Sequence, residues 1–371
     1  RKRLLPHSST IKWLLNAAKG YAIKAVNPCG SDNWKWGENV HGLGEKGVKF
    51  DVTPKEMITT LSEVSRRLKL PHPLHLHTID LGVPGNYEST LETLNILRGK
   101  RAHLTHLQFH SYGGSSWGNL SSQAGEIAEK IKGSNITVDS GQIIFGDVTT
   151  MTADAPWEYR LHRLSGNKWV NNDVEIECGS GVVPYKYRKK NPVNAIQWAI
   201  GLELLLSIDP WHIFLTTDNP NGGSFTSYPY IIRLLMDKKF REEELSTLHP
   251  KARNTSLPDI DKEYTLGEIA TITRGATARA LGLKNKHLGV GADADIAIYP
   301  IKENKAEMFS KASYVIKGGE LVVRDGKAIA EKYGKTFMLD LKIEPDPDVR
   351  EFFKYYTVDI ENYPVEMAYL P

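Results

Sequence analysis

The chain has 371 residues, of which 40% are hydrophobic and 25% are charged, so its composition is that of a globular protein with a large core. Its formal net charge of +3 is too small to indicate a nucleic-acid partner, and no apolar run is long enough to span a membrane. Only two cysteines are present, which excludes a disulfide framework and favours a reducing, cytoplasmic location. The first residue is Arg1 and not methionine, and we expect a fragment whose N-terminal portion is missing.

Strand-like and helix-like segments alternate along most of the chain. The second helix is expected to begin at a capping box formed by Thr53 and Glu56. Such alternation predicts a parallel sheet, either closed into a barrel or doubly wound. The expected helices are 11–20, 54–70, 88–98, 121–133 and 191–208, and the expected strands are 21–28, 73–82, 101–114, 135–146 and 211–218.

Histidines are concentrated in two of these strands. Six of the twelve histidines fall within residues 72–110. Because residues two apart on a strand point to the same face, His75 and His77 are expected to share one face, and His106 and His110 another. Imidazole is the commonest protein ligand for divalent metals, and this density has no packing explanation. The pattern predicts a metal site.

The positions of polar residues along the strands favour a closed barrel. Lys24, His77, His106 and Asp218 all lie near the carboxyl ends of their predicted strands. Barrel enzymes place their catalytic groups there because the loops that follow the strands shape the site. A doubly wound sheet would carry a phosphate-binding GxGxxG turn after its first strand, and none follows 21–28. We therefore predict an α/β fold of the (β/α)8 barrel type.

Two regions depart from the alternation. Residues 147–190 lack clear periodicity and are expected to form a long functional loop. Residues 286–335 contain short alternating strands with Gly and Asp turns, which are typical of a small β-sandwich. The predicted organisation is a partial barrel over 1–285, a β-sandwich segment over 286–335 and a C-terminal tail over 336–371.

A strand lysine, two strand histidines and a strand-terminal aspartate, in this order, resemble the metal-binding pattern of the amidohydrolase superfamily. The resemblance implies a metal-dependent (β/α)8 barrel, lacking its first strands here. It also implies that the lysine is carboxylated and bridges two divalent metals, which we expect to be zinc. In such sites the aspartate binds one metal and accepts a proton from the bridging water.

Longer segments, including AIKAVNP, THLQFHSYGG, MTADAPWEY and TTDNPNGGSFTSYP, resemble the A-subunit family of formylmethanofuran dehydrogenases. In this family a partner subunit with a tungsten or molybdenum pterin reduces carbon dioxide to formate, in the first step of methane formation. The family member itself condenses formate with the amine of methanofuran, and the reverse reaction hydrolyses the formyl amide. The resemblance implies other subunits of that complex as partners, and formate and methanofuran as substrates.

Site residues follow from matching the motifs one by one. Lys24 corresponds to the carboxylated lysine, and His106 to a strand ligand. Either His75 or His77 corresponds to the other strand ligand. Asp218 corresponds to the catalytic aspartate, which is also a metal ligand, and His77 is the next candidate for proton transfer. The HxH pair of the family's first barrel strand is absent, so this chain alone is expected to hold at most part of the metal centre.

Five residues are assigned to substrate binding. Asn219 stands where the family pattern has a histidine, so the contact there is expected to differ. His110 either binds substrate or only shapes its loop. Trp157 suits the furan ring of the carrier, and Lys186 and Arg188 suit the carboxylates of its tail. The alternative for this basic run is a solvated surface.

Three other functions remain open at this stage. The first is the related formyltransferase/hydrolase complex of methylotrophic bacteria, which acts on a similar carrier without a pterin subunit. The second is a catalytically inactive scaffold subunit, against which the four polar strand ends argue. The third is a general cyclic-amide hydrolase, which the long specific segments disfavour.

Overall fold

The computed structural model describes most of the chain, apart from its two ends and much of the long excursion before residue 183. The described residues are 8–30, 39–48, 51–150, 152–154, 158–160, 162–163, 166 and 183–341. Trp157 lies outside them, so its contact with substrate stays a prediction. No helix among the described residues combines the length and the apolarity needed to cross a membrane.

The centre of the molecule is a parallel sheet whose strands follow one another in chain order. Within the described residues it has five strands, ordered β1-β2-β3-β6-β9, and every neighbouring pair is parallel. Parallel neighbours in chain order require a crossover after each strand, as in an α/β barrel. The predicted alternation is therefore confirmed. The strands are β1 (Lys24–Val26), β2 (Leu74–His77), β3 (Ala102–Leu104), β6 (Ile136–Asp139) and β9 (Ile213–Phe214).

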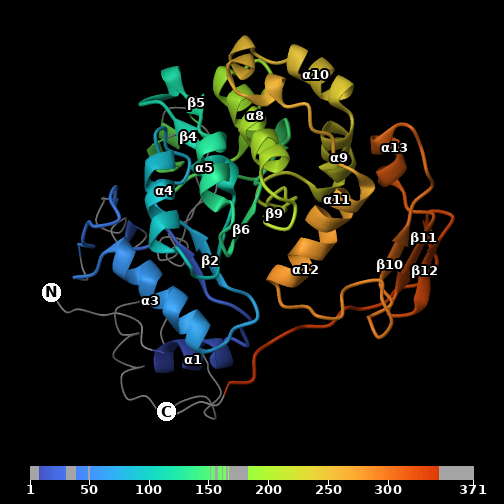
Figure 1. The fold of residues 1–371 in the computed structure, drawn as a ribbon, viewed down its shortest axis with the longest axis horizontal. Coiled ribbons are helices and arrows are strands. Elements are labelled where there is room, and N and C mark those ends of the chain that lie inside the picture. Colours follow the sequence, from blue (N-terminus) through green and yellow to red (C-terminus); the bar gives the residue numbers. More distant parts are fainter. Residues whose placement is uncertain are drawn as a thin grey trace.

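The helices that connect these strands lie side by side in the same order (Figure 1). The capping box predicted at the start of α3 is present, because Glu56 N donates to Thr53 Oγ1 at 3.2 Å and Thr53 N to Glu56 Oε2 at 3.0 Å. The helices before and around the sheet are α1 (Ser8–Ala17), α3 (Pro54–Arg67), α4 (Tyr87–Ile96), α5 (Ala124–Ile131) and α8 (Pro192–Ser207). Those that follow it are α9 (Tyr228–Met236), α10 (Lys238–Ser246), α11 (Leu266–Ala270) and α12 (Ala276–Ala280).

The two faces of the sheet differ in chemistry. Leu74 and Leu76 are fully buried on the helix-covered face. The opposite, interior face carries a row of polar residues, because Lys24 pairs in register with His75 and His75 with His103. Lys24 is the first residue of β1, and its predicted position near the carboxyl end of the strand is wrong.

The strand predicted at 101–114 is also wrong beyond residue 104. Leu107–His110 form a short 3-10 helix, which leads to the two-residue strand β4 (Tyr112–Gly113). The strand stops because His106 adopts a left-handed backbone conformation with φ 54°. His106 and His110 therefore do not share a strand face.

The segment predicted as a β-sandwich contains one four-stranded antiparallel sheet in the described residues. The sheet lies at one end of the molecule, and α13 (Lys305–Ser310) packs against α9 (Figure 1). None of the described residues in its strands is buried, so its packing against a second layer stays a prediction. Its strands are β10 (Ile296–Ile298), β11 (Tyr314–Lys317), β12 (Glu320–Arg324) and β13 (Lys327–Ala328).

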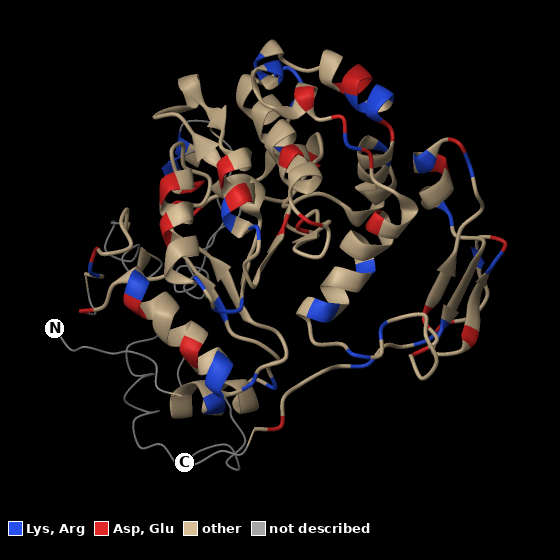
Figure 2. Cartoon of the chain, in the orientation of Figure 1, with Lys and Arg blue, Asp and Glu red and all other residues tan. Residues whose placement is uncertain are grey.

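The chain returns from this sheet to the first helix (Figure 1). Leu339 N donates to Gly20 O at 3.1 Å, and Leu341 N donates to Asn16 Oδ1 at 3.2 Å. The start of the predicted tail is therefore anchored beside α1. The domain boundaries at 285 and 335 remain predictions. Figure 2 shows acidic and basic residues interspersed over the outer helices, in keeping with the small net charge.

Close packing of α8 on the segment that follows β6 generates a stability prediction. A Cβ at Gly201 would lie 2.7 Å from Cγ1 of Ile143, which is fully buried. Gly201→Ala should therefore lower the free energy of unfolding by about 1–3 kcal/mol. Gly125, in α5, is the matched control, because its Cβ would meet no described atom within 4 Å. Gly125→Ala should be neutral or stabilise by up to about 1 kcal/mol. Equal effects of the two variants in denaturant unfolding would contradict the packing of α8.

Candidate active site

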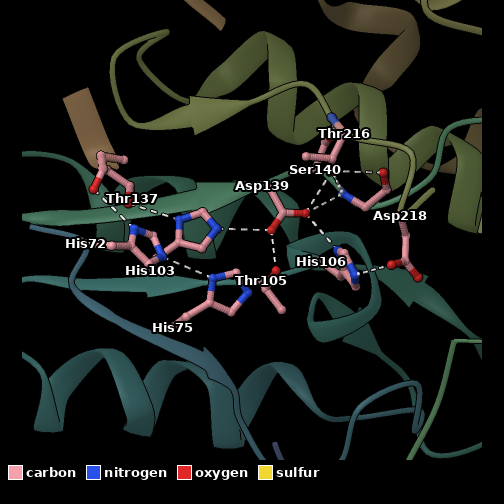
Figure 3. A network of polar contacts seen from close by, with 12 residues as sticks. His72, His75, His103, Thr105, His106, Thr137, Asp139, Ser140, Thr216 and Asp218 are labelled. Atoms are coloured by element: carbon pink, nitrogen blue, oxygen red, sulfur yellow. Dashed lines mark hydrogen bonds and ion pairs between the residues drawn. The ribbon is translucent and has the colours of Figure 1, made fainter. Parts of the chain in front are cut away.

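The carboxylate of Asp139, the last residue of β6, is the centre of a polar network on the interior face of the sheet (Figure 3). The residue is 2% exposed. Its oxygens accept five hydrogen bonds from donors in the described part of the chain. Oδ1 accepts from His106 Nδ1 at 2.7 Å, Thr216 Oγ1 at 2.8 Å and Gly141 N at 3.2 Å, and Oδ2 accepts from His103 Nε2 at 3.1 Å and from Thr105 Oγ1.

These donors keep Asp139 ionised. Burial alone would raise the pKa of Asp139, but the neighbouring His106 and the imidazole hydrogen bonds outweigh burial and hold the pKa well below its usual range. Asp139 was not among the site residues predicted from the sequence. The signal was present, because Asp139 ends a strand just as Asp218 was predicted to do.

His106 lies between two carboxylates. Its Nδ1 donates to Asp139, and its Nε2 is 3.0 Å from Asp218 Oδ1 (Figure 3). Burial alone would lower the pKa of His106, but the Asp139 and Asp218 carboxylates raise it to about 10. The arrangement brings together two residues that are 112 positions apart in the numbering and that the sequence analysis assigned to one site.

A second group of imidazoles lies in the row of His75. The ring nitrogen His72 Nδ1 is 3.1 Å from the carbonyl oxygen of Ala280, so it must donate, and its Nε2 must accept from His75 Nδ1 at 3.2 Å. The rings of His75 and His103 are 4.8 Å apart. Burial lowers the pKa of His72 to about 4 and that of His75 to about 2. These imidazoles are neutral at physiological pH.

His77 and His110 lie outside the row of His75, close to His106. The His77 ring centroid is 5.0 Å from that of His106 and 6.4 Å from that of His110. Burial lowers the pKa of His77 well below its usual value and that of His110 to about 3. Nδ1 of His77 and both ring nitrogens of His110 are buried and have no hydrogen-bond partner among the described residues. Neutral imidazoles with unpaired nitrogens suit a metal or a polar substrate.

The two remaining predicted ligands are Asp218, which contacts His106, and Lys24, which pairs in register with His75. Lys24 is exposed, and its positive charge contributes to lowering the pKa of His75 and His77. Asp218 has a left-handed backbone with φ 54°, and the next residue, Asn219, is exposed and precedes a cis proline. Among the described side chains, no group of three or more His, Cys, Asp and Glu residues is arranged to hold a metal ion.

Two of the predicted carrier-binding residues line a cavity of about 380 Å³. Lys186 lies on β8 (Tyr185–Tyr187), which pairs with β7 (Gly146–Val148). Its Nζ is 3.1 Å from Asp147 Oδ2. Arg188 follows the strand. The lining consists of Asp147, Val148, Pro184, Tyr185, Lys186, Arg188 and Asn191.

Comparisons with known proteins agree with one another. The model of the amidohydrolase family matches residues 8–323. Protein FwdA of Methanocaldococcus jannaschii is 49% identical over 97% of this chain and 68% of that protein. One component of the formyltransferase/hydrolase complex Fhc of Methylorubrum extorquens is 37% identical over 92% of this chain and 64% of that protein. The crystal structure of that complex, FhcABCD with methylofuran, matches with a TM-score of 0.87 and 34% identity over 98% of this chain and 68% of the other. The chain thus spans about two thirds of the length of these relatives.

The contrast between His103 and His110 gives a stability prediction. Both are buried, but His103 makes hydrogen bonds to Thr137 and Asp139. His103→Met removes both hydrogen bonds and should cost about 1–3 kcal/mol more than His110→Met, which removes only ring nitrogens without a described partner. Denaturant unfolding in the presence of a metal chelator measures this difference. If His110→Met costs as much as His103→Met, the His110 ring nitrogens have partners after all.

Proposed function

This chain belongs to the amidohydrolase family, and we propose that its interior-face histidines and aspartates form a metal-dependent site that makes and breaks a formyl amide. The observation that supports the proposal most directly is the group formed by His77, His106 and Asp218. A histidine at the end of β2, a histidine just beyond β3 and the aspartate beyond β9 lie together, an arrangement that suits metal-dependent amide chemistry. One of the similar proteins is a component of a formyltransferase/hydrolase complex, and the crystal structure of that complex holds methylofuran.

Lys24, His77, His106 and Asp218 are the residues that would hold the two metals, for which we propose zinc. Nδ1 of His77, which is buried and has no hydrogen-bond partner in the described part of the chain, supports this set. His77 is favoured over His75, because the ring of His77 lies beside His106 whereas Nδ1 of His75 is engaged by His72. When bound, divalent metals polarise the formyl carbonyl and lower the pKa of a water molecule towards neutrality. A carboxylated Lys24 would carry negative charge where an ammonium group would repel cations.

Asp218 is the residue we assign to proton transfer. In hydrolysis its carboxylate accepts a proton from the water that attacks the formyl carbon, and it returns the proton to the amine nitrogen as the C–N bond breaks. In synthesis the amine attacks the carbon of protonated formate, Asp218 takes one amine proton, and this proton leaves with the departing hydroxyl group as water. Asp218 Oδ1 lies 3.0 Å from His106 Nε2, so the two proposed ligands are adjacent. His77 is the second candidate for holding the proton.

The proposed partners follow from the relatives. We propose that the whole protein is a cytoplasmic subunit of a formylmethanofuran dehydrogenase, and that a partner subunit with a tungsten or molybdenum pterin supplies formate. The higher identity to FwdA than to the Fhc component, 49% against 37%, favours this complex over the methylotroph complex. A scaffold without activity is disfavoured, because a scaffold does not require buried imidazoles with unpaired nitrogens.

Replacing Asp218 by asparagine tests the proton transfer. Asp218→Asn keeps the shape of the side chain but removes the proton acceptor, so hydrolysis of formylmethanofuran by the purified complex should fall by about 10²–10⁴-fold. Metal content must be measured in parallel, because a ligand is altered as well. Undiminished turnover in a variant that retains its metals would place the base elsewhere, with His77 next.

The cavity beside β8 generates a second functional prediction. If Lys186 and Arg188 contact the carboxylate tail of the carrier, each contributes a few tenths to about 1 kcal/mol. The double variant Lys186→Ala, Arg188→Ala should then raise KM for the long-tailed carrier by roughly 3- to 30-fold. Its kcat for a furfurylamine lacking the tail should be unchanged, because only uniform binding energy is lost.

The matched control for this prediction is Lys189→Ala with Lys190→Ala. It removes the same charge from the same run, yet neither residue lines the cavity, and Lys189 is paired with Glu244 at 2.7 Å. An equal rise in KM for both double variants would show a general charge effect. No rise in either would make the run a solvated surface.

A further inference from the structure

Asp139 has no role in the site proposed above, although it contacts one of the proposed ligands. We infer that Asp139 is a positioning residue that holds the His106 imidazole with Nδ1 protonated and Nε2 directed at the metal centre. The inference rests on the proposed function, because it assumes that His106 is a metal ligand. It concerns how the ligand is oriented and not which reaction follows.

The contact between Asp139 and His106 fixes the position of one imidazole proton. Asp139 Oδ1 and His106 Nδ1 are 2.7 Å apart, the distance of a charge-assisted hydrogen bond. A carboxylate can only accept, so the proton must be on Nδ1. With the Nδ1 proton held in this way, Nε2, which contacts Asp218 Oδ1 at 3.0 Å, is the nitrogen that would give up its proton and offer its lone pair when a metal binds. Asp139 thus determines which ring nitrogen is available.

The Asp139 carboxylate is fully occupied by hydrogen-bond donors. An ionised carboxylate offers about four lone-pair sites. The described residues place three donors on Oδ1 and two on Oδ2 of Asp139, and the residue is 2% exposed. Asp139 therefore has no lone pair left for a metal of its own. Its influence on the centre passes through His106.

The backbone conformation of His106 places its ring between the two carboxylates. His106 has a left-handed conformation, φ 54°, which costs on the order of 1 kcal/mol for a residue other than glycine. The turn takes His106 out of β3 and places its ring between β6, which carries Asp139, and the segment after β9, which carries Asp218 (Figure 3). The contacts at the two ring nitrogens offset this strain. A histidine that remained in the strand would not reach both carboxylates.

A double-mutant cycle in the full-length protein, within its complex, tests the inference. Asp139→Asn should weaken zinc binding by about 10- to 100-fold, measured by competition with a chromophoric chelator. In the His106→Ala background the same change should weaken binding by less than about threefold, because the ligand through which Asp139 acts is gone. Visible absorption of the cobalt-substituted protein should change with Asp139→Asn only when His106 is present. An equal loss of affinity in both backgrounds would overturn the inference, since Asp139 would then act directly or on the whole structure.

A second pair of variants covers the case in which Asp139→Asn does not fold. Thr216→Val removes a donor from Oδ1, the oxygen that His106 contacts, whereas Thr105→Val removes a donor from Oδ2. Both should lower the melting temperature of the chelated protein, but only Thr216→Val should weaken zinc binding by more than about threefold. Equal effects on zinc binding would show a structural role only and overturn the inference.

The two proposals fail in different ways. A wild-type complex that contains no divalent metal would overturn the proposed metal site, and with it the role of Asp139. Normal metal binding with unchanged affinity in Asp139→Asn would overturn the role of Asp139 alone. Loss of zinc affinity in Asp139→Asn, together with undiminished hydrolysis in a metal-loaded Asp218→Asn, would support the positioning role and refute the assigned base.

Discussion

The interior of this sheet is organised by one buried negative charge. Removing a carboxylate from water carries a penalty of several kcal/mol, which only close and well-directed donors offset. Asp139 obtains them from β3 and the segment that follows it, from the segment after its own strand β6 and from the segment after β9. The donors meet at one carboxylate only in one relative placement of these strands, so the network favours the observed register.

The two faces of the sheet divide the tasks of stability and chemistry. Leucines on the outer face, such as Leu74, Leu76 and Leu104, are fully buried beneath the helices. This apolar layer provides the hydrophobic stabilisation that allows the inner face to hold charged and unpaired groups. Nδ1 of His77 and both ring nitrogens of His110, which have no partner among the residues that the structure describes, are the clearest example, because such groups persist where function requires them.

The inner face of the sheet carries two layers of histidines, which differ in whether their ring nitrogens are already hydrogen-bonded. The imidazoles of His72, His75 and His103 are engaged with one another or with neighbouring hydroxyl, carbonyl and carboxylate groups, so they support the site from within. His77 and His110 are buried, neutral and available. His106 connects the two layers through Asp139 (Figure 3).

The sequence by itself determined the alternating parallel architecture, the capping box at Thr53, the shared face of His75 and His77, and the family. These features follow from periodicity, capping and long motifs, which are local properties of the chain. It also identified His106 and Asp218, which the structure brings within 3.0 Å of each other. Only the tertiary structure decided the end of β3 at Leu104, the separate rows of His75 and His77, and the central place of Asp139. A period of two tells which face a side chain takes, but the row in which it lies depends on the register between strands. The left-handed turn at His106 is stabilised by contacts with residues far along the chain, and no local pattern predicts it.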